Sequence, residues 1–455
     1  MSTSSQRIKV SDPVVVGKDI LELLSSAMYV DPLAVYREYV QNAADSIDEA
    51  GNSLFSNGDA PKIEITLNAE DRWARIRDNG GGVSKSSFVR TLTAIGASRK
   101  RGTRARGFRG VGRLAGLAYC QEMTLRTKSQ SDQVVSVMHW DCRRLRELLR
   151  DPADLDLNQI IPEIVSTETL PAKGYPDRFF DVDLVNVSRF KNDLLLNDDA
   201  LSQYLSQVGP VPFSPEFSYG KEIVNFLSNQ DGIKSYEITV NGKPVYRPYR
   251  DSYEVRPKIH SKFERVEFYT VEGVSTGTDA VGWILHGDYS GAIPDRHGIK
   301  GLRLRIGNIQ VGDPRILDNA FPESRFNSWA VGECHVINPK VIPNARRDDF
   351  EQNNHYSNLV GHLVPKAKAI SKACRDMSSE RARKRTEALA KANGTEGLGV
   401  NWSRTKEFVT KNATKPVSSA HRAKIEQFLR DGPRTYADLL RLVFSPNGSQ
   451  PKPKE

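Results

Sequence analysis

The sequence predicts an α+β protein: two α/β domains in succession, followed by a basic helical region. Three observations lead there. A helical period runs through residues 18–50, short strands and turns alternate up to about residue 187, and a second series of strands ends near Phe350. A chain of 455 residues can hold two to three domains, each with its own core. We place them at 1–197, 198–375 and 376–455.

The first domain should begin with helices over 18–50, in which Asp31-Pro32 marks a fresh start. Further helices are predicted at 84–93 and 112–120, and strands at 62–68, 73–78, 122–128, 134–140 and 178–187. This series favours an antiparallel sheet with helices on one face, a two-layer α/β sandwich.

A helix at 199–207 and a turn-rich segment at 209–212 mark the exit into the second domain. There, the Asn241-Gly242 pair favours a tight hairpin between strands at 236–240 and 244–249. More strands are expected at 265–271, 280–286, 301–306 and 330–336. After Phe350 the chain should be helical and basic to about Ala392, followed by a linker at 393–399 and helices at 421–430 and 436–444.

Charge is distributed unevenly in this chain of net charge +9. Residues 361–455 hold 20 Lys/Arg against 9 Asp/Glu, whereas the other residues hold 45 against 47. An acidic partner would fit this excess, although a solvated basic helix and tail also explains it. Without an 18-residue apolar run, a signal core or paired cysteines, we expect a cytoplasmic protein with no membrane span, disulfide or structural zinc.

One face of the predicted helix carries groups that could hold a cation and orient a water. Glu38, Asn42 and Asp45 lie within about a 60° arc at about 100° per residue. The opposite side is an apolar stripe of Tyr36, Val40, Ala43 and Ile47. The alternative interpretation is a solvated polar face.

Asp78 ends a predicted strand on the same side as Ile76, while Arg75 and Arg77 point the other way. A buried carboxylate needs a hydrogen-bond donor, and the exocyclic amine of a purine is one. The following run of Gly80, Gly81 and Gly82 would let a flat base approach the backbone, although a plain turn is the alternative.

A loop rich in glycine and arginine follows, and seven of the fifteen residues from 99 to 113 are basic. Glycine-rich backbone that leads into a helix is a ready anion site, because free amide groups face the ligand. The spacing matches neither the dinucleotide fingerprint nor a P-loop. A flexible basic loop that contacts nucleic acid remains the alternative.

Four motifs in this order resemble those of the GHKL ATPases: Glu-x-x-x-Asn-x-x-Asp, Asp-x-Gly-x-Gly, Gly-x-Ser-x-Lys and Gly-x-x-Gly-x-Gly. The resemblance implies a Bergerat-fold domain that binds ATP and Mg²⁺ under a lid between Thr93 and Gly107. On the family pattern, Asp78 bonds the adenine amine beside Gly80 and Gly82. Glu38 is the general base, Asn42 is the Mg²⁺ ligand and Asp45 supports them. The residues left to hold the phosphates are Ser98, Lys100, Gly107, Gly110, Val111 and Gly112.

A segment of the second domain, residues 341–352, resembles the heat-shock chaperone stretch Pro-x-Asn-x-x-Arg-Glu, which supplies a catalytic arginine. Arg347 falls on that arginine and Asp348 on the acidic residue after it. The likeness implies an S5-like middle domain and places the chain nearest the ninety-kilodalton, HtpG-like chaperones. A helix start with a solvated arginine pair is the alternative.

Three departures from the family stand out. The long acidic interdomain linker is missing, and only about 80 residues follow the second domain. The family's threonine on the late strand has no match in 178–187, where Asp181 and Asp183 stand instead.

Two functions therefore remain in view. The first is an Mg²⁺-dependent ATPase acting as a conformational switch, as a homodimer that ATP could bring together, with a client protein on the C-terminal region. The second is an ATP-gated nucleic-acid clamp of the MORC or MutL kind, based on the arginine-rich lid and the basic tail. An inactive scaffold is disfavoured because no core motif residue is missing.

Overall fold

The computed structural model describes residue 18 and residues 31–55, 60–95, 112–151, 156–230 and 232–392. The chain divides into two compact units, Met1–Ser378 and Ser379–Glu455, and both sheets belong to the first. The start of the first predicted helix, most of the predicted lid, the linker at 393–399 and the helices at 421–430 and 436–444 lie outside the described residues. None of the described helices combines the length and apolarity needed to cross a bilayer.

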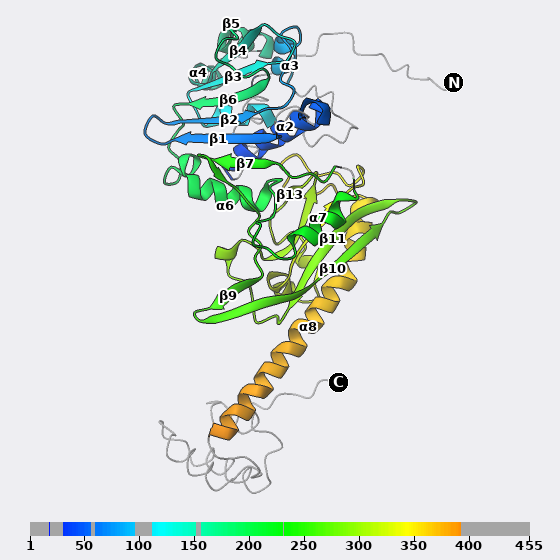
Figure 1. Cartoon of the computed structure of the whole chain (residues 1–455). Helices are drawn as coiled ribbons and strands as arrows, with labels where there is room; N and C mark the ends of the chain where they lie inside the picture. The colour runs from blue at the N-terminus through cyan, green and yellow to red at the C-terminus, as the bar shows by residue number, and fades with distance from the viewer. Residues whose placement is uncertain are drawn as a thin grey trace, which may run out of the picture. The chain divides into compact units, whose positions relative to one another are not determined.

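The first sheet has eight strands in the order β5-β4-β3-β6-β2-β1-β7-β8 (Figure 1). Its strands are β1 (Lys62–Asn68), β2 (Trp73–Asp78), β3 (Glu122–Lys128), β4 (Val134–Asp141), β5 (Val165–Pro171), β6 (Phe179–Val185), β7 (Glu237–Val240) and β8 (Lys243–Pro244). The helical segments beside it are α2 (Ala34–Ala50), η1 (Asn52–Phe55), α3 (Phe88–Thr93), η2 (Gly112–Ala118), α4 (Cys142–Arg150), α5 (Leu157–Ile164), η3 (Leu194–Leu196) and α6 (Asp198–Val208). The predicted antiparallel pairing is confirmed for β1, β2, β3, β4 and β6, and β5 is a further antiparallel strand that was not predicted.

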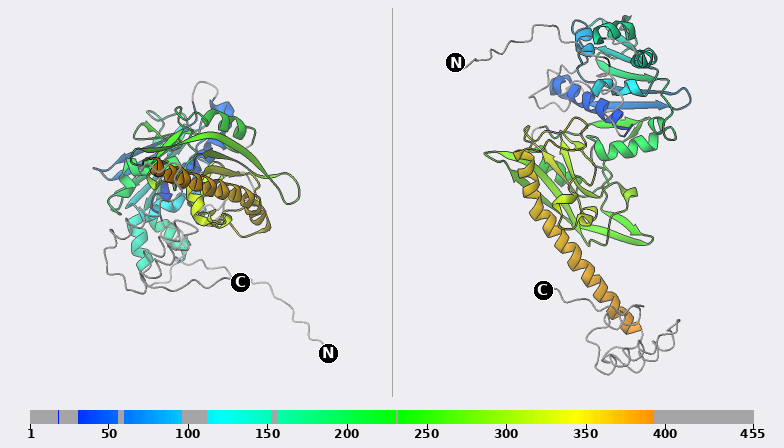
Figure 2. Two further views of the ribbon diagram at one scale, coloured as in Figure 1. Left: turned by 90° about the horizontal axis from the view of Figure 1, so that it is seen from below. Right: turned by 180° about the vertical axis from the view of Figure 1, so that it is seen from behind.

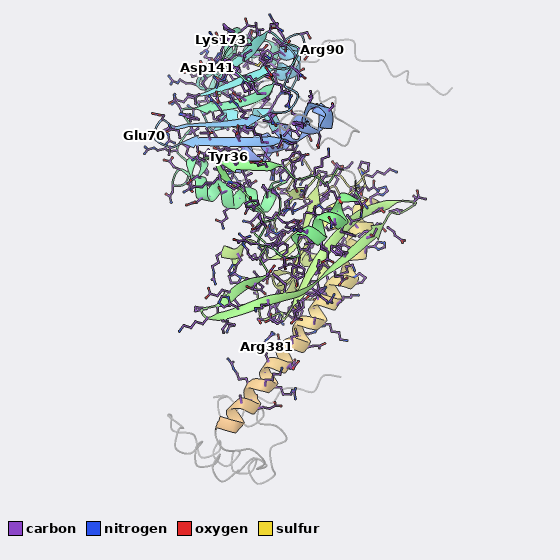
Figure 3. All side chains as sticks on the ribbon, in the orientation of Figure 1. Tyr36, Glu70, Arg90, Asp141, Lys173 and Arg381 are labelled. Atoms are coloured by element: carbon purple, nitrogen blue, oxygen red, sulfur yellow. The ribbon has the colours of Figure 1, made fainter. Side chains whose placement is uncertain are left out.

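Helix α2 forms the centre of the first core. Its start is fixed by Asp31, whose Oδ1 accepts a hydrogen bond from Leu33 N at 3.0 Å, and its end by Gly51 at φ +73°. The predicted apolar stripe is buried against the sheet. Tyr36, labelled in Figure 3, donates from its hydroxyl to the carbonyl of Leu195 at 2.5 Å. The helix is therefore tied to the sheet below it and to the segment before α6.

The hairpin predicted for the second domain belongs to the first sheet, and its second strand is only Lys243–Pro244. Strand β7 pairs in parallel with β1. Without β7, β1 would be an edge strand with unpaired backbone groups beside its isoleucine side chains. Ile238 and Val240 of β7 are buried. Asn241 adopts the positive φ expected of an Asn-Gly turn, and its Oδ1 accepts from Leu67 N at 2.8 Å.

The second sheet has six strands in the order β13-β12-β14-β11-β10-β9, all antiparallel except the parallel pair β12 and β14. Its strands are β9 (Ser252–Arg256), β10 (Ile259–Glu272), β11 (Thr278–Gly287), β12 (Gly301–Ile306), β13 (Ile309–Val311) and β14 (Val331–Val336). The helices of this region are α7 (Gly220–Ser228), η4 (Asp295–His297), η5 (Asp318–Ala320), η6 (Ser324–Trp329) and α8 (Asn354–Ala392). The first half of α8 packs along the sheet through Leu359, Leu363, Ala367 and Ile370 (Figure 2).

Two predicted helices need correction. The helix predicted at 84–93 begins only at Phe88, because residues 84–87 form a turn closed by the Ser87 N to Ser84 O bond at 3.0 Å. The segment predicted as a helix at 112–120 is the 3-10 helix η2, Gly112–Ala118. Both segments flank the loop that the motifs single out.

Ile238→Ala tests the membership of β7 in the first core. We expect the free energy of unfolding to fall by about 2–5 kcal/mol, since the side chain is 1% exposed and truncation leaves a cavity. Chemical denaturation measures this. The control Val224→Ala, at a position 47% exposed, should change stability by about 0.5 kcal/mol or less. Equal effects of the two substitutions would contradict the placement of β7.

Candidate functional site

The candidate site lies where the C-terminal end of β2 meets the polar side of α2. Glu70, in the turn between β1 and β2, marks the opposite end of these strands, and Arg90 on α3 marks the near end (Figure 3). Asp78 is the last residue of β2. The site is therefore built from strand ends and from a helix that crosses them.

The polar face of α2 is not a solvated surface. Glu38 is 6% exposed and Asp45 is 2% exposed, while Asn42 between them is half-buried. Buried carboxylates are costly unless they are bonded or paired. The interpretation as a solvated face is therefore wrong for Glu38 and Asp45, which lie inside the protein, while Asn42 keeps part of its surface exposed.

Glu38 is held between Arg37 and the start of η2. Arg37 Nη2 donates to Glu38 Oε1 at 3.1 Å, and both side chains are buried. On the other side, a Cβ added at Gly112 would lie 2.5 Å from Glu38 Oε2, so a larger residue there would displace the carboxylate. The Tyr39 hydroxyl accepts from Gly116 N at 2.9 Å and thereby fixes η2 against α2.

Asp78 is buried and bonded through one oxygen to two donors. Its Oδ1 accepts from Ser46 Oγ at 3.1 Å and from Gly80 N at 2.9 Å. A Cβ at Gly80 would lie 2.3 Å from Ser46 Oγ and 2.8 Å from the Ser46 carbonyl carbon. The glycine turn thus closes directly on α2 and orients the carboxylate, which confirms that Asp78 is a buried, core-facing carboxylate.

Thr127 is a site residue that the motif analysis missed. Its hydroxyl accepts from Val83 N at 2.9 Å and donates to the carbonyl of Phe179 at 2.8 Å. Phe180 on β6 pairs with Thr127 on β3 and, across its other edge, with Asp78 on β2. Residues paired in this way point to the same face of the sheet, so Thr127 and Asp78 share one face. The sequence signal was a polar residue at the core-facing position after Met123 and Leu125 on β3.

Arg178 is a second missed residue, immediately before β6. Its Nη1 donates to the carbonyl of Asn79, and its Nη2 donates to the carbonyl of Leu54 at 2.8 Å. The guanidinium also lies over the Phe55 ring, 4.6 Å from the centroid. Arg178 therefore ties the glycine turn to η1.

The two aspartates that stand in the late strand do not face the site. Asp181 accepts from Arg77 Nε at 2.7 Å, and Asp183 accepts from Arg75 Nε at 2.6 Å. These four residues alternate with the core-facing residues of their strands, so they lie on the other face of the sheet. They form ion pairs there and cannot substitute for a threonine in the site.

Arg347 lies in a tight turn that we call the arginine turn, residues 343–350. Arg347 is 7% exposed with φ +58°, whereas Arg346 is exposed. Arg37 Nη2, which bonds Glu38, also donates to the carbonyl of Arg346 at 3.3 Å. The segment is neither a helix start nor a solvated pair, and the structure brings it against the helix that carries Glu38.

A pocket of about 290 Å³ lies beside this contact. Its walls include Arg37 and Ala34 of α2, Tyr204 of α6, and Arg347. The described residues thus place a cavity, rather than packed side chains, between the start of α2 and the arginine turn.

Five predicted phosphate contacts lie outside the described residues, namely Ser98, Lys100, Gly107, Gly110 and Val111. Arg113, in the first turn of η2, is described: burial lowers its pKa to about 10. Its Nε and Nη2 have no hydrogen-bond partner in the described part of the chain. Within that part no cluster of three or more His, Cys, Asp and Glu could hold a metal ion, so Mg²⁺ held by Asn42 would need its other ligands from phosphate and water.

Comparison with known proteins agrees with this geometry. Residues 35–160 match the family described as Histidine kinase-, DNA gyrase B-, and HSP90-like ATPase. The chaperone protein HtpG of Idiomarina loihiensis is 25% identical over 182 residues, which cover 36% of this chain and 28% of the chaperone. HtpG of Mycolicibacterium gilvum is 33% identical over 88 residues, covering 18% of this chain and 14% of the chaperone. The matched stretches thus span between 14% and 28% of the lengths of these two relatives.

The fold and the family match together define residues 35–160 as a domain of the GHKL ATPase type. Over part of its length, the chain is similar to the HtpG chaperones of these bacteria.

Gly82→Ala tests the close packing of the glycine turn. Gly82 has φ +66°, and an added Cβ would lie 2.2 Å from the carbonyl oxygen of Lys128. Gly51→Ala is the matched control, because φ is +73° there but nothing lies within 4 Å. We expect Gly51→Ala to cost only the backbone strain, about 1–3 kcal/mol, and Gly82→Ala to cost clearly more in a thermal unfolding measurement. A smaller loss at Gly82 would show that the turn is not held as described.

Proposed function

We propose that this protein binds ATP together with Mg²⁺ and hydrolyses it, and that the hydrolysis drives a conformational switch. The observation that carries the proposal is the bridge made by Arg37. One guanidinium bonds the buried carboxylate of Glu38 and also the backbone of the turn that carries Arg347. Arg37 thus links Glu38, the proposed general base, to the turn that carries Arg347, the arginine proposed to stabilise the phosphate.

The described residues suit a nucleotide. Asp78, oriented by Ser46 and Gly80, is an acceptor for the exocyclic amine of adenine. Glycines at 80 and 112 let the backbone pack closely against Asp78 and Glu38, so the two carboxylates lie beside backbone rather than beside side chains. The guanidinium of Arg113, whose Nε and Nη2 have no hydrogen-bond partner among the described residues, suits a phosphate oxygen.

In the proposed reaction the oxygen of a water attacks the γ-phosphorus of ATP, and the bond to the β–γ bridging oxygen breaks. The water's proton passes to the Glu38 carboxylate, and ADP and inorganic phosphate are the products. Arg37 fixes the carboxylate so that Oε2 faces the start of η2. The planar fork of Arg347 stabilises the negative charge on the transferring phosphoryl group. Bound Mg²⁺, with Asn42 as its protein ligand, would neutralise part of the phosphate charge.

The switch follows from the separate origins of these groups. Glu38 and Asp78 come from the first sheet and its helix, whereas Arg347 follows the second sheet. Nucleotide in the site would therefore favour one relative placement of the two sheets, as differential binding requires. A homodimer that ATP brings together, and a client protein as the target, are the forms that the HtpG likeness suggests.

Asp78→Asn and Glu38→Ala separate binding from hydrolysis. Asp78→Asn should weaken ATP binding by about tenfold or more, because a charged acceptor for the amine is lost. Glu38→Ala should retain binding and lose about 10²–10⁴-fold in turnover. Calorimetric titration and a phosphate-release assay measure the two quantities. Unchanged affinity in the first variant, or unchanged turnover in the second, would show that the roles are assigned wrongly.

A nucleic-acid clamp is the second candidate, and the later part of α8 favours it. Arg383, Lys384 and Arg385 are exposed there, in a region whose charge balance is basic. Arg381, labelled in Figure 3, precedes them on the same helix. A cluster of this kind attracts phosphate backbones.

Binding to double-stranded DNA at two salt concentrations tests the clamp. If six or more phosphates are contacted, affinity should fall about a thousandfold between 50 and 200 mM salt. Replacement of Arg383, Lys384 and Arg385 by glutamine should reduce that slope, whereas the same substitution at Lys221 on α7 should not. Absence of binding by the full chain at low salt would remove this candidate.

A further inference from the structure

Three arginines that follow β8 bury their guanidinium groups at the end of α6. Arg247, Arg303 and Arg305 are each at most 1% exposed. Arg305 donates to the carbonyl of Gln207 and, at 3.3 Å, to that of Gly209. Cations at a helix C-terminus satisfy its last carbonyls and its dipole. The end of α6 is thus fixed to the second sheet by buried arginines.

Glu333 on β14 joins two of these arginines, Arg247 and Arg305. It accepts from Arg305 Nε at 2.6 Å, from Arg247 Nη1, and from the Tyr249 hydroxyl at 2.9 Å. A buried ion pair is strongly destabilising to break once formed, because the remaining charge lacks a partner. The buried ion pairs therefore fix the positions of these arginines and of the residues that they contact.

Arg303 extends from this cluster toward the arginine turn. Its Nη2 donates to Gln207 Oε1 on α6 at 3.3 Å, and its Nη1 donates to Gln310 Oε1 on β13 at 3.0 Å. Gln310 is 3% exposed, and its Nε2 donates to the carbonyl of Gly312 at 2.9 Å. Gly312 N in turn donates to the carbonyl of Arg347 at 2.9 Å. An unbroken series of hydrogen bonds joins α6 to Arg347.

Gly312 is shaped for this contact. Its φ is +71°, and a Cβ would lie 3.0 Å from the carbonyl oxygen of Asp348 and 2.5 Å from the Ile316 side chain. The arginine turn is closed on itself by the bond from Asn344 N to Asp349 O at 2.9 Å. The turn is thus a closed unit, and Gly312 N bonds it to the end of β13 through the carbonyl of Arg347.

We propose that Gln310, held by Arg303, is a positioning residue for Arg347, so that phosphoryl transfer depends on how the end of α6 sits on the second sheet. This inference rests on the proposed function. Gln310 has no chemical role in the proposed reaction; it lines the pocket beside Arg347 and acts through Gly312 on the placement of the Arg347 guanidinium. Misplacement of a catalytic group by about 1 Å can cost on the order of 100-fold in rate.

The test uses the full chain with Gln310→Leu, which removes both side-chain bonds, and Gln310→Glu, which keeps an acceptor for Arg303 but loses the donor to Gly312. Both should turn over ATP about 10- to 100-fold more slowly at unchanged nucleotide affinity. Asn358→Leu is the control: it removes a hydrogen bond from the Asn358 amide on α8 to the carbonyl of Glu272 on β10 and should leave turnover unchanged. Unchanged turnover in both Gln310 variants would overturn the inference.

A double-mutant cycle separates positioning from general destabilisation. If Gln310 acts through Arg347, Gln310→Leu should add no further loss in an Arg347→Ala background, whereas independent effects would multiply. Multiplied losses would contradict the inference. Failure of the proposed function looks different, because Arg347→Ala would then leave turnover unchanged.

Hydrogen exchange tests, in the absence of ATP, whether Gln310 stabilises the arginine turn. Segment 343–350 should exchange faster in both Gln310 variants of the ligand-free protein, while the buried part of α8 should not change. Equal protection of segment 343–350 in wild type and variants would overturn the inference even if activity fell.

Discussion

The whole site depends on the guanidinium of Arg37. It is buried, it bonds the carboxylate of Glu38, and it bonds the backbone of the arginine turn. A buried cation needs such partners, so the carboxylate and the turn stabilise it as much as it orders them. The first core positions α2, and the second sheet positions the arginine turn. Because both contact the same side chain, the relative placement of the two sheets affects the geometry of the site.

The first sheet keeps its two polar systems apart by simple alternation. On the face toward α2, Asp78 and Thr127 close the glycine turn and leave an oriented carboxylate. On the other face, Arg75 and Arg77 pair with the aspartates of β6. A shift of register by one residue would exchange these faces. Correct strand pairing is thus a condition for the site as well as for the core.

Local patterns predicted the parts of the structure that depend on near neighbours. The strands at 62–68, 73–78, 122–128 and 301–306 have those bounds, and Glu38 and Asp78 lie inside the protein. The predictions failed where distant segments decide. Strand β7 pairs with β1 across more than 170 residues, and the signals for Arg178 and Gln310 lie only in their tertiary contacts. The domain boundaries and the roles of the loop residues from Ser98 to Val111 stay predictions.

A crystal structure of the full chain with Mg²⁺ and a non-hydrolysable ATP analogue tests the central claim most directly. The proposal predicts the adenine amine within hydrogen-bond distance of Asp78, the metal on Asn42, and the γ-phosphate between Glu38 and the guanidinium of Arg347. A nucleotide bound elsewhere, or an arginine turn that does not reach the γ-phosphate, would contradict it.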